Sequence, residues 1–580
     1  MNEGVNVAGQ AGPASGKAEG KARSRGLMPR FLALVESVGN RMPHPTIMFI
    51  GLVAGLLVLA AVLSAFGVVA ETPTGRFAIN NLLGQDPVSL QNPRTGAVVS
   101  TYANGWQYLT QTLTPNFVGF APFGMVMVIM IAIGVAEQGG LIAAAVRKLV
   151  LSAPARLVTP VVVFAGVMSN IAADAGYLVL VPLGAVVFLG MKRHPLAGLA
   201  AAFAGVSGGF SANLIITTLD PLLGGFTLAA AKTGDAMVGT NFGETMNIAT
   251  MNYYFVVAST LLIVVLGSWV VERVIEPHLG VWRADAATPE EHAEELSEAE
   301  RRGLRRAGLA FLACVAVLAW MAFPVKSGLP LLGTLSTASL PEAQYASIMA
   351  RYGSVGFTHA PLFGTEVIVS ALFFLFLIPG LVYGMAVGRI RRGVDFVHTM
   401  EESMRGMASF VILVFFMAQF VAYFNASNIG VLIAMKGAQL LELLPHQSTA
   451  GIVLLITGFV LLSAVINLFM GSASAKWAIL APIFVPVLMT VNVSPAATQM
   501  LYRIGDSSTN IITPLMTYFA FVIVIGRKYQ KDFGIGSLVS LMLPFSIVFM
   551  IGWTLLFLVW ALAGWPIGPD SAIFFVPPSR

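Results

Sequence analysis

Long apolar stretches separated by short polar segments make up most of this chain, from Pro43 to Trp565. A helix that crosses a membrane needs about 20 consecutive apolar residues, and the pattern provides that length repeatedly. Polar residues interrupt two of the longer stretches. With these two included, we expect nine transmembrane helices, close to residues 46–68, 118–135, 196–231 (interrupted), 253–274, 308–324, 363–387, 404–424, 496–525 (interrupted) and 541–563.

The distribution of Lys and Arg orients these spans, because basic residues concentrate in cytoplasmic loops. The segments 71–111 and 326–359 hold few basic residues, and we place both outside. The basic clusters that follow the N-terminal segment are all placed inside: 147–156, 192–193, 301–306, 389–392 and 527–531.

The stretch at about 155–191 begins and ends inside, although it is apolar and is split by the polar run 169–174. A re-entrant hairpin resolves this conflict, since irregular backbone at membrane depth is tolerated where it is buried in protein or lines a wet cavity. The same parity argument predicts a second hairpin at about 450–490, which enters from outside and has its tip at 471–476. The N-terminus is then inside and the C-terminus outside.

Composition agrees with an all-α polytopic membrane protein that has nine transmembrane helices and two re-entrant hairpins. Only 11% of the residues are charged and the mean hydropathy is +0.81, whereas a soluble domain carries about 25% charge. The expected divisions are a disordered cytoplasmic tail (1–30), a first half with the inner hairpin (31–280), a cytoplasmic linker (281–306), a second half with the outer hairpin (307–569) and a C-terminal tail (570–580).

Identical residues recur in the two halves in the same order. The hairpins match at an offset of 300 in Ala173/Ala473, Ala175/Ala475, Leu180/Leu480 and Pro182/Pro482. The interrupted spans match at an offset of 297 in Gly208/Gly505, Ser211/Ser508, Asn213/Asn510 and Ile215/Ile512. We interpret the halves as inverted repeats, with chance similarity between Ala- and Leu-rich segments as the alternative. In inverted-repeat transporters, substrate and ion sites lie near the midplane, at breaks in discontinuous helices.

Three charged residues near these breaks are candidates for transport chemistry. Asp174 is the only acid of the first hairpin, and a charge at membrane depth costs at least about 2.5 kcal/mol. We expect it to bind an ion, a proton or a substrate, or else to cap a half-helix. Arg503 and Asp506 share the second break and lie three residues apart, on one helical face. They are either a substrate-anion anchor beside a coupling carboxylate or an intrahelical ion pair.

Neutral oxygens at the tips and breaks suit a hard cation such as Na⁺, which binds hydroxyl, carbonyl and carboxylate oxygens. Helix packing is the alternative for each of them. Trp477 offers a flat face either to an aromatic substrate or to ordinary packing. Lys476 is either a buried partner of an acid or a side chain that snorkels to the membrane surface. The neutral candidates are Asn170, Asn213, Asn510, Ser211, Ser472, Ser474 and Ser508.

Other functions find little support in the sequence. The seven His residues are scattered, with no metal pair at helical spacing, and the chain lacks a Walker A motif. No basic patch with interleaved aromatic residues predicts nucleic-acid binding. The spans show no nucleophile–base pair, so we expect no enzyme. A channel-like facilitator for small organic anions is the alternative to a coupled transporter.

Several segments resemble the AbgT family of p-aminobenzoyl-glutamate transporters and antimetabolite efflux proteins, over about residues 31–569. They are 38–45, 169–182, 205–218, 471–486 and 503–514. The resemblance implies a homodimer with nine spans and two hairpins per subunit. It implies transport of p-aminobenzoyl-glutamate or related folate breakdown products, and export of sulfonamides by some members. Family positions implicated in transport match Asp174, Trp477, Pro495 and Arg503, and a family cation site matches Asn467 and Asp506.

This family in turn resembles a wider ion-transporter superfamily, whose hairpin tips carry Ser-Asn motifs. Ser169 and Asn170 fit that motif, whereas the second tip, 471–474, lacks the Asn. We therefore expect a secondary active transporter of the bacterial inner membrane, coupled to H⁺ or Na⁺, whose partners are a small-molecule substrate and membrane lipid. No cofactor other than Na⁺ is expected. The sequence does not decide between import and export, or between H⁺ and Na⁺ as the coupling ion.

Overall fold

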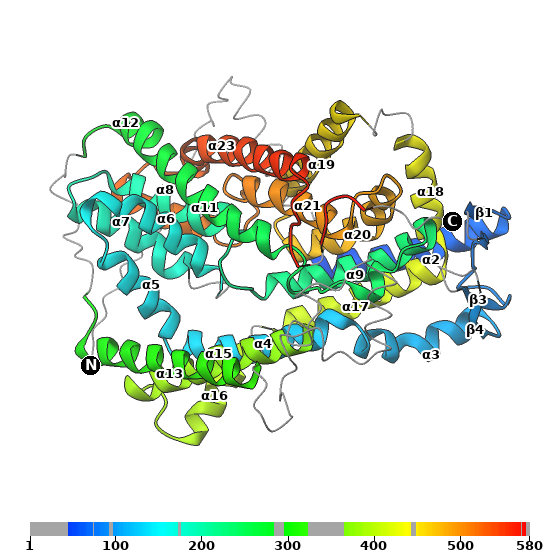
Figure 1. The fold of residues 1–580 in the computed structure, drawn as a ribbon, viewed down its shortest axis with the longest axis horizontal. Coiled ribbons are helices and arrows are strands. Elements are labelled where there is room, and N and C mark those ends of the chain that lie inside the picture. Colours follow the sequence, from blue (N-terminus) through cyan, green and yellow to red (C-terminus); the bar gives the residue numbers. More distant parts are fainter. Residues whose placement is uncertain are drawn as a thin grey trace, which may run out of the picture.

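The computed structural model describes residues 44–72, 75–91, 97–171, 176–282, 295–322, 365–405, 407–441, 448–569 and 571–575. Helices make up most of this part, as Figure 1 shows, and the expected helical membrane fold is confirmed. Asp174 lies outside the described residues. So do the tail 1–30, the segment 326–359, the centre of the linker 281–306 and much of the tail 570–580.

Within the described residues, eight helices are long and apolar enough to cross a membrane, or up to nine if a bent pair counts as one span. The expected spans 196–231 and 496–525 break into shorter helices, while Thr449–Phe469, expected as one hairpin leg, is long enough to cross alone. The total of nine spans stays a prediction. The eight are Pro45–Ala65, Gly105–Gln138, Tyr253–Leu279, Glu298–Met321, Val367–Ala386, Ala408–Ala426, Thr449–Phe469 and Ile535–Leu562.

The first hairpin follows a sharp bend. Helix α5 (Leu141–Leu151) and the helical stretch Ala155–Ser169, made of η1 (Ala155–Leu157) and α6 (Val158–Ser169), turn by 115° at a break that contains Pro154. Beyond the tip, the π-helical turn η2 (Gly176–Leu180) leads into α7 (Val181–Gly190). The legs meet closely, because a Cβ on Gly176 would lie 2.1 Å from Ser169 Oγ. The described ends of the two legs are thus packed against each other, as backbone at membrane depth requires.

The second hairpin consists of α19 (Thr449–Phe469) and α20 (Ala473–Met489), and α21 (Pro495–Asn510) follows it. All three begin at a serine cap. Ser448, Ser472 and Ser494 each accept a hydrogen bond from a backbone N–H three residues later, at 3.1, 3.3 and 3.1 Å. These bonds satisfy free donors at the helix N-termini. Pro495 suits the first position of α21, where a backbone N–H would have no helical partner.

The first interrupted span breaks where the sequence predicts, whereas the second breaks later in the chain. Helix α8 (Pro195–Phe203) and the π-helical turn η3 (Ala204–Gly208) precede the irregular segment 209–218, and α9 (Leu219–Val238) follows. In the second half, α21 runs unbroken to Asn510, and the irregular segment is 511–518. Arg503 and Asp506 therefore lie inside a helix, and the prediction that they lie at the break is wrong. The helix tolerates them because each has a side-chain partner, described below.

The two broken helices correspond at a different offset from the one read in the sequence. Asn213 lies in an irregular segment, whereas Asn510 ends α21. The first residues of α8 and α21, Pro195 and Pro495, are 300 positions apart. The same offset pairs Gly205 with Gly505. A Cβ on either glycine would lie 2.4 Å from a carbonyl oxygen of the preceding hairpin's first leg, that of Val163 or Val460. Each glycine thus permits close packing against that leg.

We expect Gly505→Ala to lower the free energy of unfolding in detergent by about 1–3 kcal/mol, because its methyl group would overlap the α19 backbone. Gly458→Ala, on α19 itself, is the matched control, since no atom lies within 4 Å of a Cβ there. That control should be neutral or slightly stabilising, as Ala is the better helix former. Denaturant unfolding of the purified full chain compares the two. Equal stabilities would contradict the close packing at Gly505.

A second group of helices packs beside the hairpins and forms the lower part of Figure 1. In it, α13 (Glu298–Ala322) packs on α15 (Thr365–Ala386), and both α15 and α16 (Gly393–Arg405) pack on α4 (Ala121–Gln138). Because α4 also contacts α9, this group is joined to the hairpin core. The remaining helices are α2 (Pro45–Ala65), α3 (Gly105–Val118), α10 (Phe242–Thr245), α11 (Tyr253–Val270), η4 (Val271–Ile275), α12 (Glu276–Leu279), α17 (Ala408–Ala426), α18 (Ile429–Leu441), α22 (Phe519–Tyr529) and α23 (Ile535–Leu562).

Four short strands, which are not predicted from the sequence, add to the helical fold. They are β1 (Val69–Thr72), β2 (Gly75–Ala78), β3 (Val88–Gln91) and β4 (Val98–Tyr102). They form two antiparallel pairs, β1 with β2 and β3 with β4. Both pairs lie at the end of the molecule near α18 (Figure 1). Most of this region belongs to the polar segment 71–111, which we predict to be outside.

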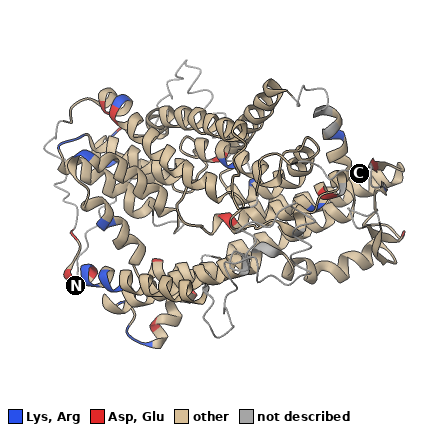
Figure 2. Ribbon diagram, in the orientation of Figure 1, with Lys and Arg blue, Asp and Glu red and all other residues tan. Residues whose placement is uncertain are grey.

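Basic side chains gather at the opposite end. Figure 2 shows blue residues around α12, α5 and the start of α13, and fewer beside the strands. Two of them form partly exposed ion pairs there, Arg193 with Glu276 at 2.7 Å and Arg147 with Glu300 at 3.6 Å. This uneven distribution of basic residues fits the predicted orientation, with the α12 end inside.

Candidate functional site

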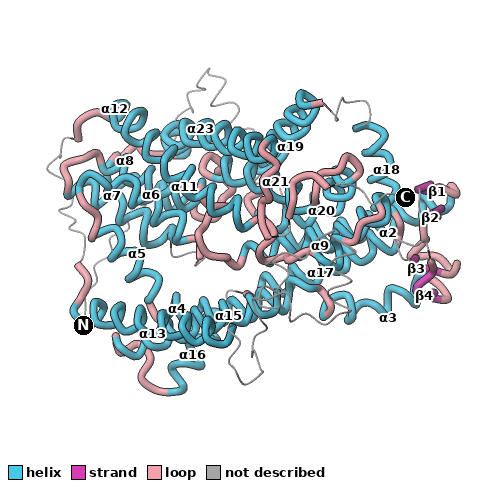
Figure 3. The backbone as a smooth tube through the Cα atoms, viewed as in Figure 1, coloured by secondary structure: helices cyan, strands magenta, loops and turns pink. Residues whose placement is uncertain are grey.

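The polar residues of the second hairpin lie within the helical body. Figure 3 shows loop segments beside α20 and α21 there, and not only at the ends of the bundle. Every residue of α21 from Pro495 to Thr509 is buried, including Arg503 and Asp506. An unpaired charge in such surroundings is very unfavourable, so the partners of these side chains define the site.

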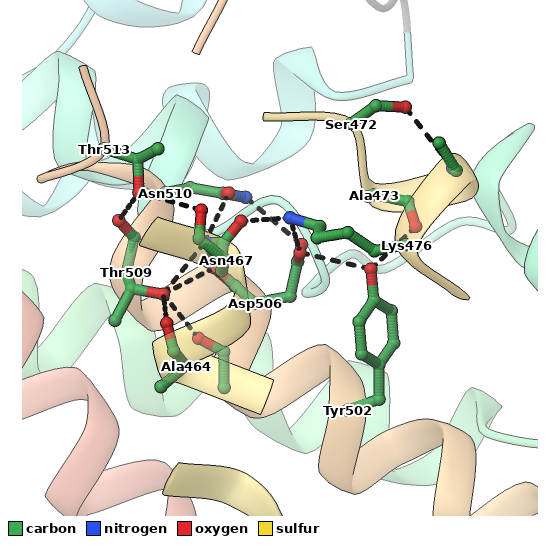
Figure 4. Close-up of polar contacts among 12 residues, drawn as sticks. Ala464, Asn467, Ser472, Ala473, Lys476, Tyr502, Asp506, Thr509, Asn510 and Thr513 are labelled. Atoms are coloured by element: carbon green, nitrogen blue, oxygen red, sulfur yellow. Dashed lines mark hydrogen bonds and ion pairs between the residues drawn. The ribbon is translucent and has the colours of Figure 1, made fainter. Parts of the chain in front are cut away.

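Lys476, in the first turn of α20, reaches Asp506 on α21 (Figure 4). The Lys476 Nζ atom lies 2.5 Å from Asp506 Oδ1, and the two side chains are 0% and 1% exposed. The same ammonium group donates to Oδ1 of Asn467, near the end of α19. Lys476 is therefore the buried partner of an acid, and the alternative that it snorkels to the membrane surface is wrong.

The amide group of Asn467 is held by α21. Its Nδ2 lies 2.7 Å from the carbonyl oxygen of Asp506, 2.8 Å from Thr509 Oγ1 and 2.9 Å from Asn510 Oδ1. These contacts turn Oδ1 of Asn467 toward Lys476 (Figure 4). Asn510 Nδ2 also donates to Asp506 Oδ2 at 3.3 Å. Three predicted site residues, Asn467, Asp506 and Asn510, thus share one network.

Arg503 pairs with an acid from the first half of the chain. Its NH1 lies 2.7 Å from Asp220 Oδ1, near the start of α9. The other oxygen, Oδ2, accepts hydrogen bonds from the backbone N–H and the hydroxyl of Thr217, at 2.7 and 3.0 Å. The N-terminal turn of α9 also favours a carboxylate. Arg503 and Asp506 thus bind other partners, and the intrahelical ion pair considered as an alternative is not what the structure shows.

One buried N–H donor of Arg503 is available for a further hydrogen bond. Its Nε is buried and has no hydrogen-bond partner among the described residues. A guanidinium group carries five N–H donors in a rigid fork, and Asp220 engages only one side of that fork in the contacts described. A second carboxylate could accept from the free donor without displacing Asp220.

Trp477 is fully buried beside the ion pairs. Its ring stacks on Tyr502, with centroids 4.6 Å apart and an interplanar angle of 22°, and its Nε1 donates to Thr227 Oγ1 at 2.9 Å. The Tyr502 hydroxyl in turn lies 2.7 Å from the carbonyl oxygen of Ala473 and 3.2 Å from Asp506 Oδ1. One face of Trp477 is therefore covered, and in this conformation the residue packs as a core side chain.

Asn170 and Asn213 connect the first tip to the first break. Asn170 Nδ2 donates to the carbonyl oxygen of Gly209, and Asn213 Nδ2 donates to that of Val167, both at 3.3 Å. Asn170 Oδ1 is buried and has no partner within the described part of the chain. Asn467 occupies a comparable place, near the end of the first leg and bonded to the following broken helix. In the second hairpin, the Asn in this position is therefore Asn467, which precedes the tip 471–474.

The predicted serines have smaller roles in this conformation. Ser472 caps α20, and its Oγ lies 3.5 Å from that of Ser474, with both residues half-buried. Ser508 donates to the carbonyl oxygen of Ile504 at 2.7 Å, within its own helix. Pro495 only starts α21. Ser472 and Ser474 therefore lie at the edge of the Lys476 network, while Ser508 packs within α21.

The sequence match to known proteins covers this whole arrangement. A family model described as the AbgT putative transporter family matches residues 30–575. The chain belongs to the AbgT family. The matched region contains both hairpins, both broken helices and the two buried ion pairs, so the geometry above is that of an AbgT protein.

Named relatives support the assignment. The p-aminobenzoyl-glutamate transport protein of Escherichia coli (strain K12) is 35% identical over 538 residues, which are 92% of this chain and 95% of the relative. The solved YdaH transporter of Alcanivorax borkumensis is 39% identical, with a TM-score of 0.76, over 91% of this chain and 100% of its own. MtrF of Neisseria gonorrhoeae, described as illuminating a class of antimetabolite efflux pumps, is 39% identical, with a TM-score of 0.77, over 92% and 97%.

Family membership confirms several predictions about this AbgT chain. It is a transport protein and not an enzyme, and its apolar helices make it a multi-pass membrane protein. Its bacterial relatives agree with a location in the inner membrane. The substrate, the coupling ion and the homodimer stay predictions.

Four residues of this site are not among those predicted from the sequence: Asp220, Thr217, Tyr502 and Thr227. Asp220 had a usable signal, because it is an acid within the expected span 196–231, where a charge is as unfavourable as it is at Asp174. The other three are residue types that are common in membrane helices. Only their contacts with Asp220, Asp506 and Trp477 single them out.

The family resemblance assigns a cation site to Asn467 and Asp506, and the oxygens for such a site are present. Oδ1 of Asn467 and Oδ1 of Asp506 converge on one point. That point is taken by the Lys476 ammonium group (Figure 4). As they are arranged, these residues do not fit a Na⁺ ion together with Lys476.

Proposed function

We propose that this AbgT protein is a secondary active transporter of p-aminobenzoyl-glutamate or related aromatic carboxylates, driven by an H⁺ or Na⁺ gradient. The observation that carries the proposal is the buried Arg503, whose only described ion pair leaves one donor unused. A planar guanidinium fork suits a carboxylate. A buried cation with spare binding capacity, in the membrane-embedded core of a transporter, suits an anionic substrate.

The surroundings of Arg503 favour an aromatic substrate. Tyr502 precedes it on α21, and the Tyr502 ring stacks on Trp477. A substrate ring that reaches this stack meets faces suited to offset or edge contact. The relatives point in the same direction, since one is named for p-aminobenzoyl-glutamate and another is linked to antimetabolite efflux. Export of sulfonamides by the same site, in a homodimer, is the extension that we propose.

The Arg503–Asp220 pair also offers a way to couple binding to movement. It joins α21 to α9 through two residues that are 283 positions apart in the chain. A substrate carboxylate that binds the free donor of the guanidinium group shares its positive charge with Asp220, and this weakens the link between the two halves. Alternating access in inverted-repeat folds needs one part to move against the other around a fixed site. We therefore place the substrate between α9 and α21.

Purified protein in proteoliposomes tests the proposal. An H⁺ gradient and a Na⁺ gradient are each imposed alone. Under one of them, we expect saturable, concentrative movement of labelled p-aminobenzoyl-glutamate or of a labelled sulfonamide. Counterflow should follow when the vesicles are preloaded with unlabelled substrate. The sign of the gradient that drives accumulation distinguishes import from export.

Empty liposomes and protein-containing liposomes without a gradient serve as controls. Flux that is neither saturable nor concentrative, with no counterflow, would identify a channel-like facilitator for small organic anions instead. Absence of flux for both compounds under both gradients would contradict the proposed substrate class.

A further inference from the structure

Lys476 occupies an unfavourable position for a cation. It lies in the first turn of α20, where the helix dipole places partial positive charge. Its side chain is 0% exposed, and an ammonium group at membrane depth is costly on every scale. Strong local interactions must therefore hold it there.

Those interactions come from oxygens that converge on Nζ. Asp506 Oδ1 lies 2.5 Å away, and Asn467 Oδ1 accepts a hydrogen bond from the same group. The carboxylate is fixed by Asn510 at Oδ2, and Asn467 is fixed by α21 through its Nδ2. The oxygens are thus positioned by residues other than Lys476, as in a built cation site.

The ammonium group and a Na⁺ ion compete for these oxygens. Both are monovalent cations that bind carboxylate and amide oxygens, and among the described residues of this network Asp506 supplies the single negative charge. Two cations against one Asp506 oxygen would repel each other in surroundings of low dielectric constant. The site therefore holds one or the other.

We propose that Lys476 is the internal cation of this site: its ammonium group takes the position of a Na⁺ ion, so that the wild-type chain binds no Na⁺ between Asn467 and Asp506. The inference deepens the proposed function, because it concerns the coupling ion. It rests on the network itself and is tested by binding, so that a failure to transport p-aminobenzoyl-glutamate would leave its outcome unchanged.

The test compares Na⁺ binding by the wild type and by Lys476→Met in the purified full chain. In the variant, the oxygens lose their tethered cation and Asp506 keeps its charge. We expect the melting temperature of K476M to rise by about 2 °C or more when about 300 mM choline chloride is replaced by NaCl, since a ligand that binds only the folded state stabilises it. The wild type should show no Na⁺-specific shift. Binding of ²²Na⁺ should be saturable in K476M and absent in the wild type.

Two further variants make the result specific. Lys476→Met combined with Asp506→Asn should lose the Na⁺ response, because the carboxylate is gone. Lys436→Met, which alters an exposed lysine on α18, should behave as the wild type does. Lys476→Gln replaces K476M if the latter does not fold, since its amide keeps a polar group within reach of Asp506.

Saturable ²²Na⁺ binding by the wild type that disappears in Asp506→Asn would overturn the proposal. So would the absence of any Na⁺-specific shift or binding in a folded K476M or K476Q protein, because the vacated oxygens would then not form a cation site.

Discussion

Replacing Arg503 by methionine is expected to abolish transport and to lower the free energy of unfolding by about 3–5 kcal/mol, because it leaves a buried carboxylate without its charged partner. That carboxylate is Asp220, whose pairing with Arg503 at 2.7 Å is almost fully buried. Uptake into proteoliposomes and denaturant unfolding in detergent measure the two effects.

Two related variants separate a structural role from a substrate-binding role. Arg503→Met combined with Asp220→Asn removes both charges and should recover most of the stability, yet stay inactive, because the guanidinium anchor is missing. Arg503→Lys keeps the charge but loses the fork that binds carboxylates. We expect its uptake to fall by about tenfold or more while its stability stays close to that of the wild type.

Arg405→Gln is the matched control for the loss of an arginine. Arg405 pairs with Glu402 at the same distance, 2.7 Å, but both side chains are exposed. An exposed pair is worth about 0–1 kcal/mol, so this variant should transport normally. Wild-type transport by the Arg503→Met, Asp220→Asn double variant would show that Arg503 only holds the fold together.

Trp477→Ala is expected to cost about 3–5 kcal/mol of stability, since it empties a large buried site. The ring is 0% exposed and stacks on Tyr502. Because Tyr502 also contacts Asp506 at 3.2 Å, the loss of the stack should disturb the Lys476 network and abolish transport. Denaturant unfolding and uptake, measured on the same preparation, test both parts.

The indole N–H can be tested separately from the ring. Trp477→Phe keeps a ring against Tyr502 but loses the hydrogen bond to Thr227, and Thr227→Val removes the same bond from the other side. If the bond only orients the indole, both variants should lose a similar, small amount of stability, about 1 kcal/mol in the free energy of unfolding. Abolished transport in Trp477→Phe with normal transport in Thr227→Val would instead show that the indole contacts substrate.

Local signals in the sequence were sufficient for much of the fold. The repeated apolar stretches predicted the membrane helices, because each stretch must bury its length in lipid or protein whatever its neighbours are. The polar run 471–476 marks the turn between α19 and α20, and the run 169–174 follows α6. The starts of α20 and α21 also carry local cap signals, Ser472 and Ser494 followed by Pro495.

The sequence alone located the breaks in the interrupted spans less accurately than it located the membrane helices. Gly208 and Gly505 look equivalent in the sequence, but α21 continues past Gly505 to Asn510, whereas η3 ends at Gly208. Polar residues in an apolar span signal either an irregular segment or a helix with buried partners. The sequence does not show those partners, so Arg503 and Asp506 were assigned to the break.

By itself, the sequence of this protein determined which residues are charged or polar within the membrane, since that depends only on residue type and on the length of the apolar stretches. The tertiary structure decided how they pair: Arg503 with Asp220, and Lys476 with Asp506 and Asn467. Arg503 and Asp506 lie on one helix, three residues apart, yet each finds its partner on another helix. The physical reason is that a buried charge pairs with whatever the packed helices bring within hydrogen-bond distance, and helix packing is not encoded in local spacing.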